Sequence, residues 1–412
     1  MGQRIAWAIL AGVFLLGCSG PYEWSPQERR FFEALSTPYR NWSETTYGLT
    51  PNPYERTLLK TYKPRVFISP RGIGPVDFYE DYLPQTELVD HTGKVASRRV
   101  NRMLLKAFER SPGFSLRFRG PSPVCIGEAC RNKRTRGYGQ VYYGDVDLGE
   151  GVVLHYQVLK YNFVFPYSGL PARLSRAQEW LSGVVGDPKH WHDLDLHGAI
   201  HVFVEGSGGE PFMVLLAQHN HFRTYLVGSD IMWSPEAGLR ICFAERSNEP
   251  YPCPLKQATR NVPAAATPDH VDFLFGKGDG GGGLFTGHDL VVGEAGGATP
   301  IDYDLAYLPS EDPLYTAWIP LGGRRGLGPL RFFQSGPPGM NFKFNPKLKT
   351  YFDIAQFFSF VPGDRVALRL AKEQSASMFS EDYDFMPLYR WNGRALRSSL
   401  KERFFSGYSP SR

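Results

Sequence analysis

Runs of apolar residues along the chain predict a protein built mainly from β-strands. Strands are predicted at Arg65–Ser69, Val152–Phe165, Ala199–Val204, Phe212–Gln218, Leu239–Ala244 and Val271–Phe275. The glycine-rich segment Glu205–Glu210 separates two of these strands, which is a hairpin signal. Apolar residues at helical spacing predict helices at Ser97–Arg110 and Arg173–Val185, and glycine and proline follow each of them.

The composition agrees with a β-rich chain that contains many loops. Aromatic residues make up 14% of the sequence, and there are 44 glycines and 33 prolines. We therefore expect an α+β protein that is mainly β: an antiparallel β-sandwich with a few peripheral helices. The sandwich module is predicted to cover residues 63–330. A tether and irregular arm are expected at residues 18–62, and a β-rich extension packed on the module is expected at residues 331–412.

The N-terminus has the pattern of an export signal. A cationic start, Met1–Arg4, precedes the apolar run Ile5–Leu16, which is too short to span a bilayer as a mature helix. The tetrapeptide Leu15-Leu16-Gly17-Cys18 resembles the lipobox of bacterial lipoproteins, and an ordinary secretory signal is the alternative. The resemblance implies that residues 1–17 are removed and that Cys18 is acylated, so that lipid holds the protein on a membrane. Ser19 is not the Asp that retains many lipoproteins at the inner membrane, so we expect the outer membrane.

The four remaining cysteines form two close pairs in the sequence. Cys125 and Cys130 flank one short loop, and Cys242 and Cys253 flank another. Four cysteines allow three pairings, and we predict the two local disulfides. A zinc site is the alternative, but neither pair has the two-residue spacing of a zinc knuckle. An oxidising compartment outside the cytoplasm favours disulfides.

The charge of the chain is mildly positive, at +5. The basic cluster Arg131–Arg136 could contact anionic lipid or the phosphates of a glycan, although a solvated loop is the simpler interpretation. Nucleic acid is not expected as a partner, because no aromatic residues are interleaved with this cluster. The segment Gly276–Gly281 matches G-x-G-x-x-G, but no helix follows it, so we expect a loop and no dinucleotide site. The oligomeric state cannot be read from the sequence.

Histidine and aspartate residues are concentrated around the predicted hairpin. Six of the ten histidines lie between residues 190 and 221. A turn centred near residues 207 and 208 places His197 opposite Gln218, and Asp195 opposite Asn220, to within a residue or two. In an extended segment, Asp193, Asp195 and His197 point to one face.

Two carboxylates on one face repel each other unless a cation lies between them. Carboxylate oxygens suit Ca²⁺, Mg²⁺ or Mn²⁺, and imidazole ligands widen the choice to Zn²⁺. The residues around the predicted cation are candidates for catalysis or for supporting its ligands: His192, His197, Gln218, His219 and His221. The alternative is a polar strand end on the protein surface.

The segment Lys189–Asp195 resembles the G-H-R-H-D-W-E hallmark of necrosis- and ethylene-inducing peptide-like proteins. It is also similar to the H-x-G-D-W-E motif of the vacuolar-sorting-associated β-sandwich family. Further segments follow in the order of that second family: Lys63–Pro70, Pro75–Tyr79, Tyr156–Tyr167, Leu215–His219 and Gly287–His288.

The resemblance implies a β-sandwich that holds a divalent cation, usually Ca²⁺. Carried over, its ligands are His190, Asp193 and Asp195, with Asp187 the nearest substitute for an upstream aspartate of the family. Leu194 stands where the family has tryptophan, and Asp195 is one methylene shorter than the family's glutamate.

Three functions are compatible with these features. The first is an envelope lipoprotein whose metal site helps to bind a lipid headgroup or a glycan at a membrane surface. The second is a metal-dependent hydrolase of an ester or a phosphate, in which His219 or His221 moves protons. The third is a structural envelope protein in which the cluster has no catalytic role.

Overall fold

The computed structural model describes most of the chain between residues 52 and 335. The described residues are 52–109, 111, 113–119, 125–149, 152–169, 177, 192–205, 209–218, 221–228, 230–254, 258–262, 272–273, 285–286, 289–307, 312–316, 321–322, 324–325 and 334–335. The predicted helix Arg173–Val185 lies outside them apart from Ala177, which is helical. The predicted signal peptide, the tether up to residue 51 and nearly all of the C-terminal extension also lie outside.

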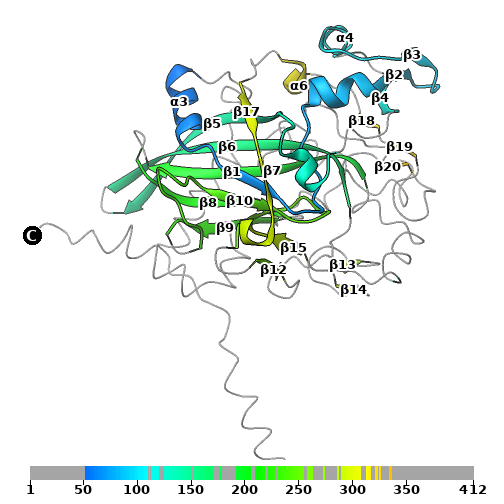
Figure 1. Ribbon diagram of the computed structural model, residues 1–412. Helices are drawn as coiled ribbons and strands as arrows, with labels where there is room; N and C mark the ends of the chain where they lie inside the picture. The colour runs from blue at the N-terminus through cyan, green and yellow to red at the C-terminus, as the bar shows by residue number, and fades with distance from the viewer. Residues whose placement is uncertain are drawn as a thin grey trace, which may run out of the picture.

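Two β-sheets form the centre of the molecule (Figure 1). The larger sheet has the order β17-β5-β6-β7-β8-β9, and the smaller one has the order β11-β10-β1-β16. The strands of the larger sheet are β17 (Tyr303–Ala306), β5 (Thr135–Gly149), β6 (Val152–Ser168), β7 (His192–Glu205), β8 (Pro211–Gln218) and β9 (His221–Leu226). Those of the smaller sheet are β11 (Pro250–Pro252), β10 (Arg240–Phe243), β1 (Arg65–Ile68) and β16 (Thr299–Ile301). Neighbours are antiparallel except for the parallel pairs β17–β5 and β1–β10.

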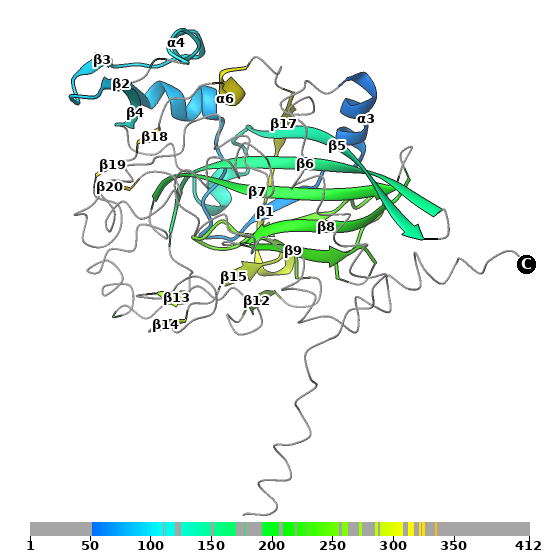
Figure 2. The ribbon, with the colours of Figure 1, turned by 180° about the vertical axis from the view of Figure 1, so that it is seen from behind.

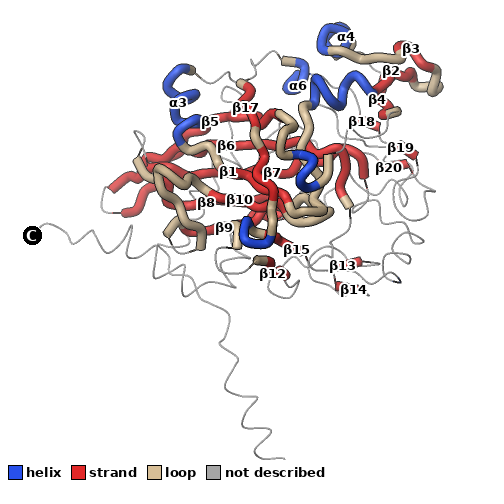
Figure 3. The backbone as a smooth tube through the Cα atoms, in the orientation of Figure 1, coloured by secondary structure: helices blue, strands red, loops and turns tan. Residues whose placement is uncertain are grey.

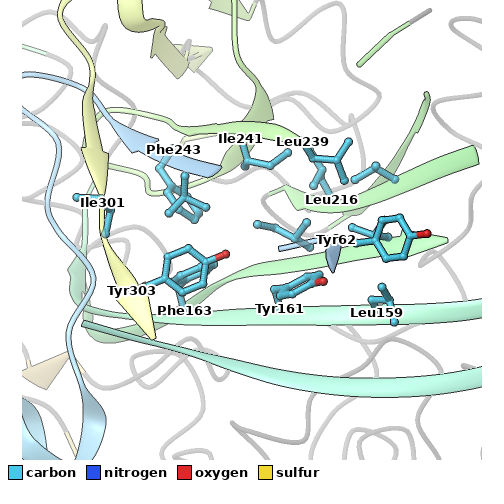
Figure 4. Packing of buried hydrophobic residues seen from close by; sticks show 14 of the residues in the cluster. Tyr62, Leu159, Tyr161, Phe163, Leu216, Leu239, Ile241, Phe243, Ile301 and Tyr303 are labelled. Atoms are coloured by element: carbon cyan, nitrogen blue, oxygen red, sulfur yellow. The ribbon is translucent and has the colours of Figure 1, made fainter. Parts of the chain in front are cut away.

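The two sheets enclose one apolar core, which confirms the predicted sandwich. Alternate residues of β6, from Leu159 to Phe165, point into this core, and Ile241 and Phe243 of β10 meet them from the other sheet. Figure 4 shows Tyr303 beside Phe163, whose ring centroids lie 4.8 Å apart at an edge-to-face angle of 79°. Because successive side chains of a strand point to opposite faces, period-two burial of this kind fixes which face of β6 meets the partner sheet.

A second core covers the opposite face of the larger sheet at one end. A small sheet with the order β18-β4-β2-β3 packs there. Its strands are β18 (Leu321–Gly322), β4 (Phe114–Phe118), β2 (Thr86–Asp90) and β3 (Val95–Ser97). Buried Leu88, Leu116 and Phe118 of this sheet join Val164 and Leu194 of β6 and β7 in one cluster. The molecule is therefore a sandwich with an additional small sheet attached to its outer face.

Helices lie around the sheets and not between them (Figure 3). They are α3 (Pro53–Thr61), the π-helix η2 (Phe78–Tyr82), η3 (Leu83–Gln85), α4 (Arg102–Ala107), η4 (Gly127–Cys130), η7 (Glu294–Gly296) and α6 (Pro313–Thr316). Among the described residues, no helix has the length and hydropathy needed to cross a bilayer.

Two of these helices differ from the expectation. The end of the segment expected as an irregular arm forms α3, because Asn52 and Glu55 make a capping box and Leu58 and Leu59 are buried against the sandwich. Conversely, the predicted helix Ser97–Arg110 shrinks to α4. Its N-cap is Asn101, whose side chain accepts a hydrogen bond from the Leu104 amide at 2.8 Å.

Both predicted disulfides are present. Cys125 is bonded to Cys130, and Cys242 is bonded to Cys253. The second disulfide connects β10 to the residue that follows β11, inside a third apolar cluster that also includes Val291. The remaining short strand pairs are β12 (Thr259–Val262) with β15 (Asp289–Val292), β13 (Asp272–Phe273) with β14 (Phe285–Thr286), and β19 (Arg324–Arg325) with β20 (Gln334–Ser335).

Candidate functional site

The histidine- and aspartate-rich segment forms the start of β7. Along this strand Asp193 pairs with Tyr167 of β6, Asp195 pairs with Phe165, and His197 pairs with Phe163. The hairpin register is one residue away from the prediction, since Ile200 pairs with Leu216 and not with Leu215. The far end of β8 closes with Gln218 paired to His221 of β9.

The structure describes the proposed cation ligands and their neighbours to different extents. Asp187, His190 and His219 lie outside the described residues, as does Cys18. For a second group of residues the structure describes the strand backbone and not the side chain: His192, Asp193, His197, Gln218 and His221. The side chain of Asp195 is described, and it is 1% exposed. The candidate site is therefore built outward from Asp195.

Asp195 contacts a turn that the sequence patterns did not single out. The turn Ala244–Glu249 connects β10 to β11 in the opposite sheet. Asn248 in this turn donates its side-chain amide to Asp195 Oδ2 at 3.2 Å and to the carbonyl oxygen of Tyr167 at 2.9 Å. One buried amide thus joins the ends of β6 and β7 to the facing sheet.

The backbone around this contact adopts the left-handed region three times. Leu194 has φ 56°, Arg246 has φ 72° and Asn248 has φ 60°, and these are the non-glycine residues with positive φ in the described part of the chain. Asparagine tolerates this region, whereas leucine and arginine are destabilised in it by steric clashes of the Cβ atom. Such strain persists only where the surrounding structure enforces it, and it often marks functional sites.

A second buried carboxylate lies on the other side of the same turn. Asp289, the first residue of β15, accepts hydrogen bonds from the Ser247 hydroxyl at 2.7 Å and the Tyr251 hydroxyl at 2.6 Å. We call Asp195, Asn248, Ser247, Asp289 and Tyr251 the Asp195–Asp289 network. All five residues are at most 3% exposed. The network connects the histidine-rich segment with the segment that follows His288.

The chemistry of this network fits a divalent cation in part. Both oxygens of Asp289 are occupied by hydroxyl donors, so this residue holds the turn in place. Asp195 supplies a hard carboxylate near the start of β7, where Ca²⁺ or Mg²⁺ would find a suitable ligand. Within the described residues, no three His, Cys, Asp or Glu side chains are grouped closely enough to hold a metal. A complete site therefore requires ligands from the neighbouring segment that includes Asp187 and His190.

The segment Pro75–Tyr79 builds a second polar centre, at the start of π-helix η2. Asp77 caps this helix, accepting hydrogen bonds from the amides of Tyr79 and Glu80, and it forms an ion pair with Arg136 at 2.7 Å. Burial raises the pKa of the Asp77 carboxyl above its ordinary value of 3.8, while Arg136 and the two amides oppose that shift. π-helical turns are frequent at functional sites, but every described contact of Asp77 is structural.

Three buried polar residues also line up on the outer face of the larger sheet. Gln140 of β5, Lys160 of β6 and His201 of β7 are neighbours in the strand register, and each is at most 5% exposed. Sequence reasoning missed this row because each residue stands alone among apolar neighbours along its own strand. The signal that could have found it is the strand register, which brings the three together.

Comparison of the chain with protein-family models, with curated proteins and with solved structures finds no match.

Proposed function

We propose that the chain is a lipid-anchored protein of the bacterial cell envelope whose β-sandwich holds a divalent cation at the start of β7. Ca²⁺ is preferred over Mg²⁺, Mn²⁺ and Zn²⁺, because the resemblance to the necrosis- and ethylene-inducing peptide-like proteins implies Ca²⁺ and a carboxylate such as that of Asp195 suits a hard cation. The bound cation would serve to bind a lipid headgroup or a glycan at a membrane surface. The lipobox Leu15–Cys18 supports the anchor, and the outer membrane is the preferred location because Ser19 follows Cys18.

The compartment is supported by the covalent structure. Both disulfides lie in local loops that an oxidising environment would close. Neither bond requires a partner chain, so the exported protein can complete its disulfides during its own folding. This agrees with a protein that acts outside the cytoplasm.

One observation carries the cation site: of the three left-handed non-glycine residues in the described chain, Leu194 precedes the buried Asp195, and Arg246 and Asn248 belong to the turn that contacts Asp195. Asn248 fixes the orientation of that carboxylate, and Asp289 fixes the turn that bears Asn248 through Ser247. A divalent cation would supply a positive centre for an anionic oxygen of the ligand. The residues of the chain would orient this centre and keep Asp195 away from bulk water.

Isothermal calorimetry of the purified mature chain with Ca²⁺ tests this proposal. We expect one bound ion, and an increase in unfolding free energy of about 2.7 kcal/mol at a hundredfold excess over Kd. Asp193→Asn should abolish both the binding heat and the fall in melting temperature on chelation, while His192→Gln should have a smaller effect. Asp302→Asn, an exposed aspartate away from β7, serves as the control.

A wild-type protein that gives no binding heat and ignores chelators would refute the cation site and favour a structural envelope protein. If the Ca²⁺-loaded protein hydrolyses a simple ester or phosphate and Asp193→Asn loses this activity, the proposed function becomes metal-dependent hydrolysis and not binding. Binding of headgroup or glycan without turnover supports the proposal as stated.

A further inference from the structure

The positive charge of the chain is concentrated in one small part of the molecule. Residues 86–119 include β2, β3, α4 and β4, and we call them the basic lobe. They contain eight Lys or Arg residues and three Asp or Glu residues, which gives a net charge of +5. The whole chain also carries +5. The remainder of the sequence therefore has no net charge, and the basic lobe is the cationic part of the protein.

Several cations of this lobe are free to meet a partner. Lys94, Arg98 and Arg99 are exposed, and none of them forms an ion pair with another described residue. The cluster Arg131–Arg136 is different, because its described cations are matched by acids. Arg131 pairs with Glu128, and Arg134 pairs with Asp304. Within the lobe, Arg102, Lys106, Arg117 and Arg119 also pair with acids. The described cations of the lobe without an ion pair are therefore Lys94, Arg98 and Arg99.

The lobe also presents an apolar side chain between its charges. Met103 of α4 is 79% exposed, and it follows Arg98 and Arg99 by a few residues. On the same helix, Leu105 is buried in the cluster that joins the lobe to the larger sheet. Leu104 also packs against this cluster, so α4 is held on that side while Met103 projects into solvent, where an apolar side chain can enter a bilayer interface.

The charges are fixed to the body of the protein. Tyr82 of η2 stacks on Phe118 of β4 with ring centroids 4.6 Å apart, and Phe108 packs edge-to-face on Phe114. Figures 1 and 2, which view the molecule from opposite sides, both show the lobe and α3 toward the edge of the larger sheet where β17 and β5 lie.

We propose that the basic lobe docks onto anionic phospholipid headgroups of a membrane, with Arg98, Arg99 and Lys94 at the headgroup level and Met103 entering the interface. Each basic residue near such a surface contributes about 1 kcal/mol, and the attraction falls off within a Debye length. This proposal uses neither Asp195 nor a bound cation, so it stands apart from the proposed cation site.

Vesicle sedimentation tests the docking. The protein is the mature chain, residues 18–412, with Cys18→Ser so that no acyl chain holds it on the vesicles. We expect binding to phosphatidylcholine vesicles that contain phosphatidylglycerol, little binding to pure phosphatidylcholine, and loss of binding in high salt. Arg98→Gln with Arg99→Gln should weaken binding about thirtyfold, which corresponds to about 2 kcal/mol for two charges. Met103→Gln should cause a smaller loss that salt does not change.

The matched control is Arg131→Gln with Arg134→Gln, which removes the same charge from exposed residues outside the lobe. Retained binding in this control supports the lobe, whereas a loss as large as that of Arg98→Gln with Arg99→Gln would show that only net charge matters. Equal binding to neutral and anionic vesicles would overturn the proposal. Tighter binding to a soluble anionic polysaccharide than to anionic vesicles would also overturn it.

Discussion

At the scale of single residues, Asn248 does the most to hold the candidate site together. Its side-chain amide reaches β6 and β7, while its backbone amide donates to the carbonyl oxygen of Ala244 within its own turn. It does this from a left-handed backbone conformation, which asparagine tolerates better than most residues. Its identity is therefore set by two requirements at once, a hydrogen-bond donor and a positive φ.

Replacement of Asn248 separates these two requirements. Asn248→Ala loses both side-chain hydrogen bonds and places a Cβ-bearing residue without a polar group at φ 60°. We expect the free energy of unfolding to fall by about 3 kcal/mol, measured by urea unfolding. Asn248→Gly loses the same hydrogen bonds without the steric penalty, so its free energy of unfolding should fall by about 1 kcal/mol less than that of Asn248→Ala. Equal losses in the two variants would show that the backbone conformation is not strained.

Asp77 gives a pH-dependent prediction. Its folded-state pKa is raised by burial, so the native protein binds this proton more tightly than the unfolded chain does. The resulting stabilisation is present below the unfolded pKa and is lost as the pH rises through the folded pKa. Asp77→Asn keeps the acceptor for the Tyr79 and Glu80 amides and does not titrate.

We therefore expect the unfolding free energy of the wild type, relative to Asp77→Asn, to fall as the pH is raised from about 4 to about 6. Urea unfolding at a series of pH values measures this difference. A difference that rises over this range would mean that the ion pair with Arg136 outweighs burial.

At the scale of elements, the sequence predicted strands where apolar residues run together. It missed strands that glycine interrupts, such as β5, and short strands that mix polar and apolar residues, such as β2, β4 and β9. β6 and β8 lie close to their predicted ranges, and their residues 156–166 and 211–216 are buried. β7 begins at His192, seven residues before the predicted strand Ala199–Val204. β5 was not predicted, because glycines break its pattern. A Cβ at Gly137 would lie 2.9 Å from ring atoms of Tyr303, so the glycine is required by the close approach of β17.

The candidate site shows the same limit. The histidine and aspartate pattern located the start of β7, but Asn248 and Asp289 belong to segments far along the chain. Their contact with Asp195 depends on how the two sheets face each other, and no local pattern encodes that arrangement. The capping box that starts α3, in contrast, is visible at Asn52 and Glu55 and could have been recognised.

The two disulfides act on different elements and should differ in their contributions. Cys242–Cys253 closes a loop with a sequence separation of 11, whereas Cys125–Cys130 closes one of 5. Replacing the two cysteines of one disulfide by alanine should lower the free energy of unfolding through the loop-closure entropy. We expect a loss of about 3 kcal/mol for the longer loop and about 2 kcal/mol for the shorter one. Urea unfolding of both double variants tests this order. A reversed order would show that packing around the sulfur atoms outweighs loop entropy.

At the scale of the whole molecule, the covalent lipid anchor is proposed to depend on one residue. Cys18→Ser should abolish labelling by radioactive palmitate and, in salt high enough to release the basic lobe, move the protein from the membrane fraction to a soluble or unprocessed form. Cys18 is not one of the cysteines of the two disulfides, so the variant should keep both bonds, which non-reducing peptide mapping can verify. Continued labelling in the variant would remove the basis for the proposed anchor.

The uneven distribution of charge has a consequence for how the molecule approaches a charged surface. A body without net charge that carries a cationic lobe on one side is an electric dipole, and a dipole experiences a torque in a field. Near a negative surface the torque turns the lobe toward that surface before any contact forms. Orientation would thus precede docking, and most encounters would begin with the same face of the protein.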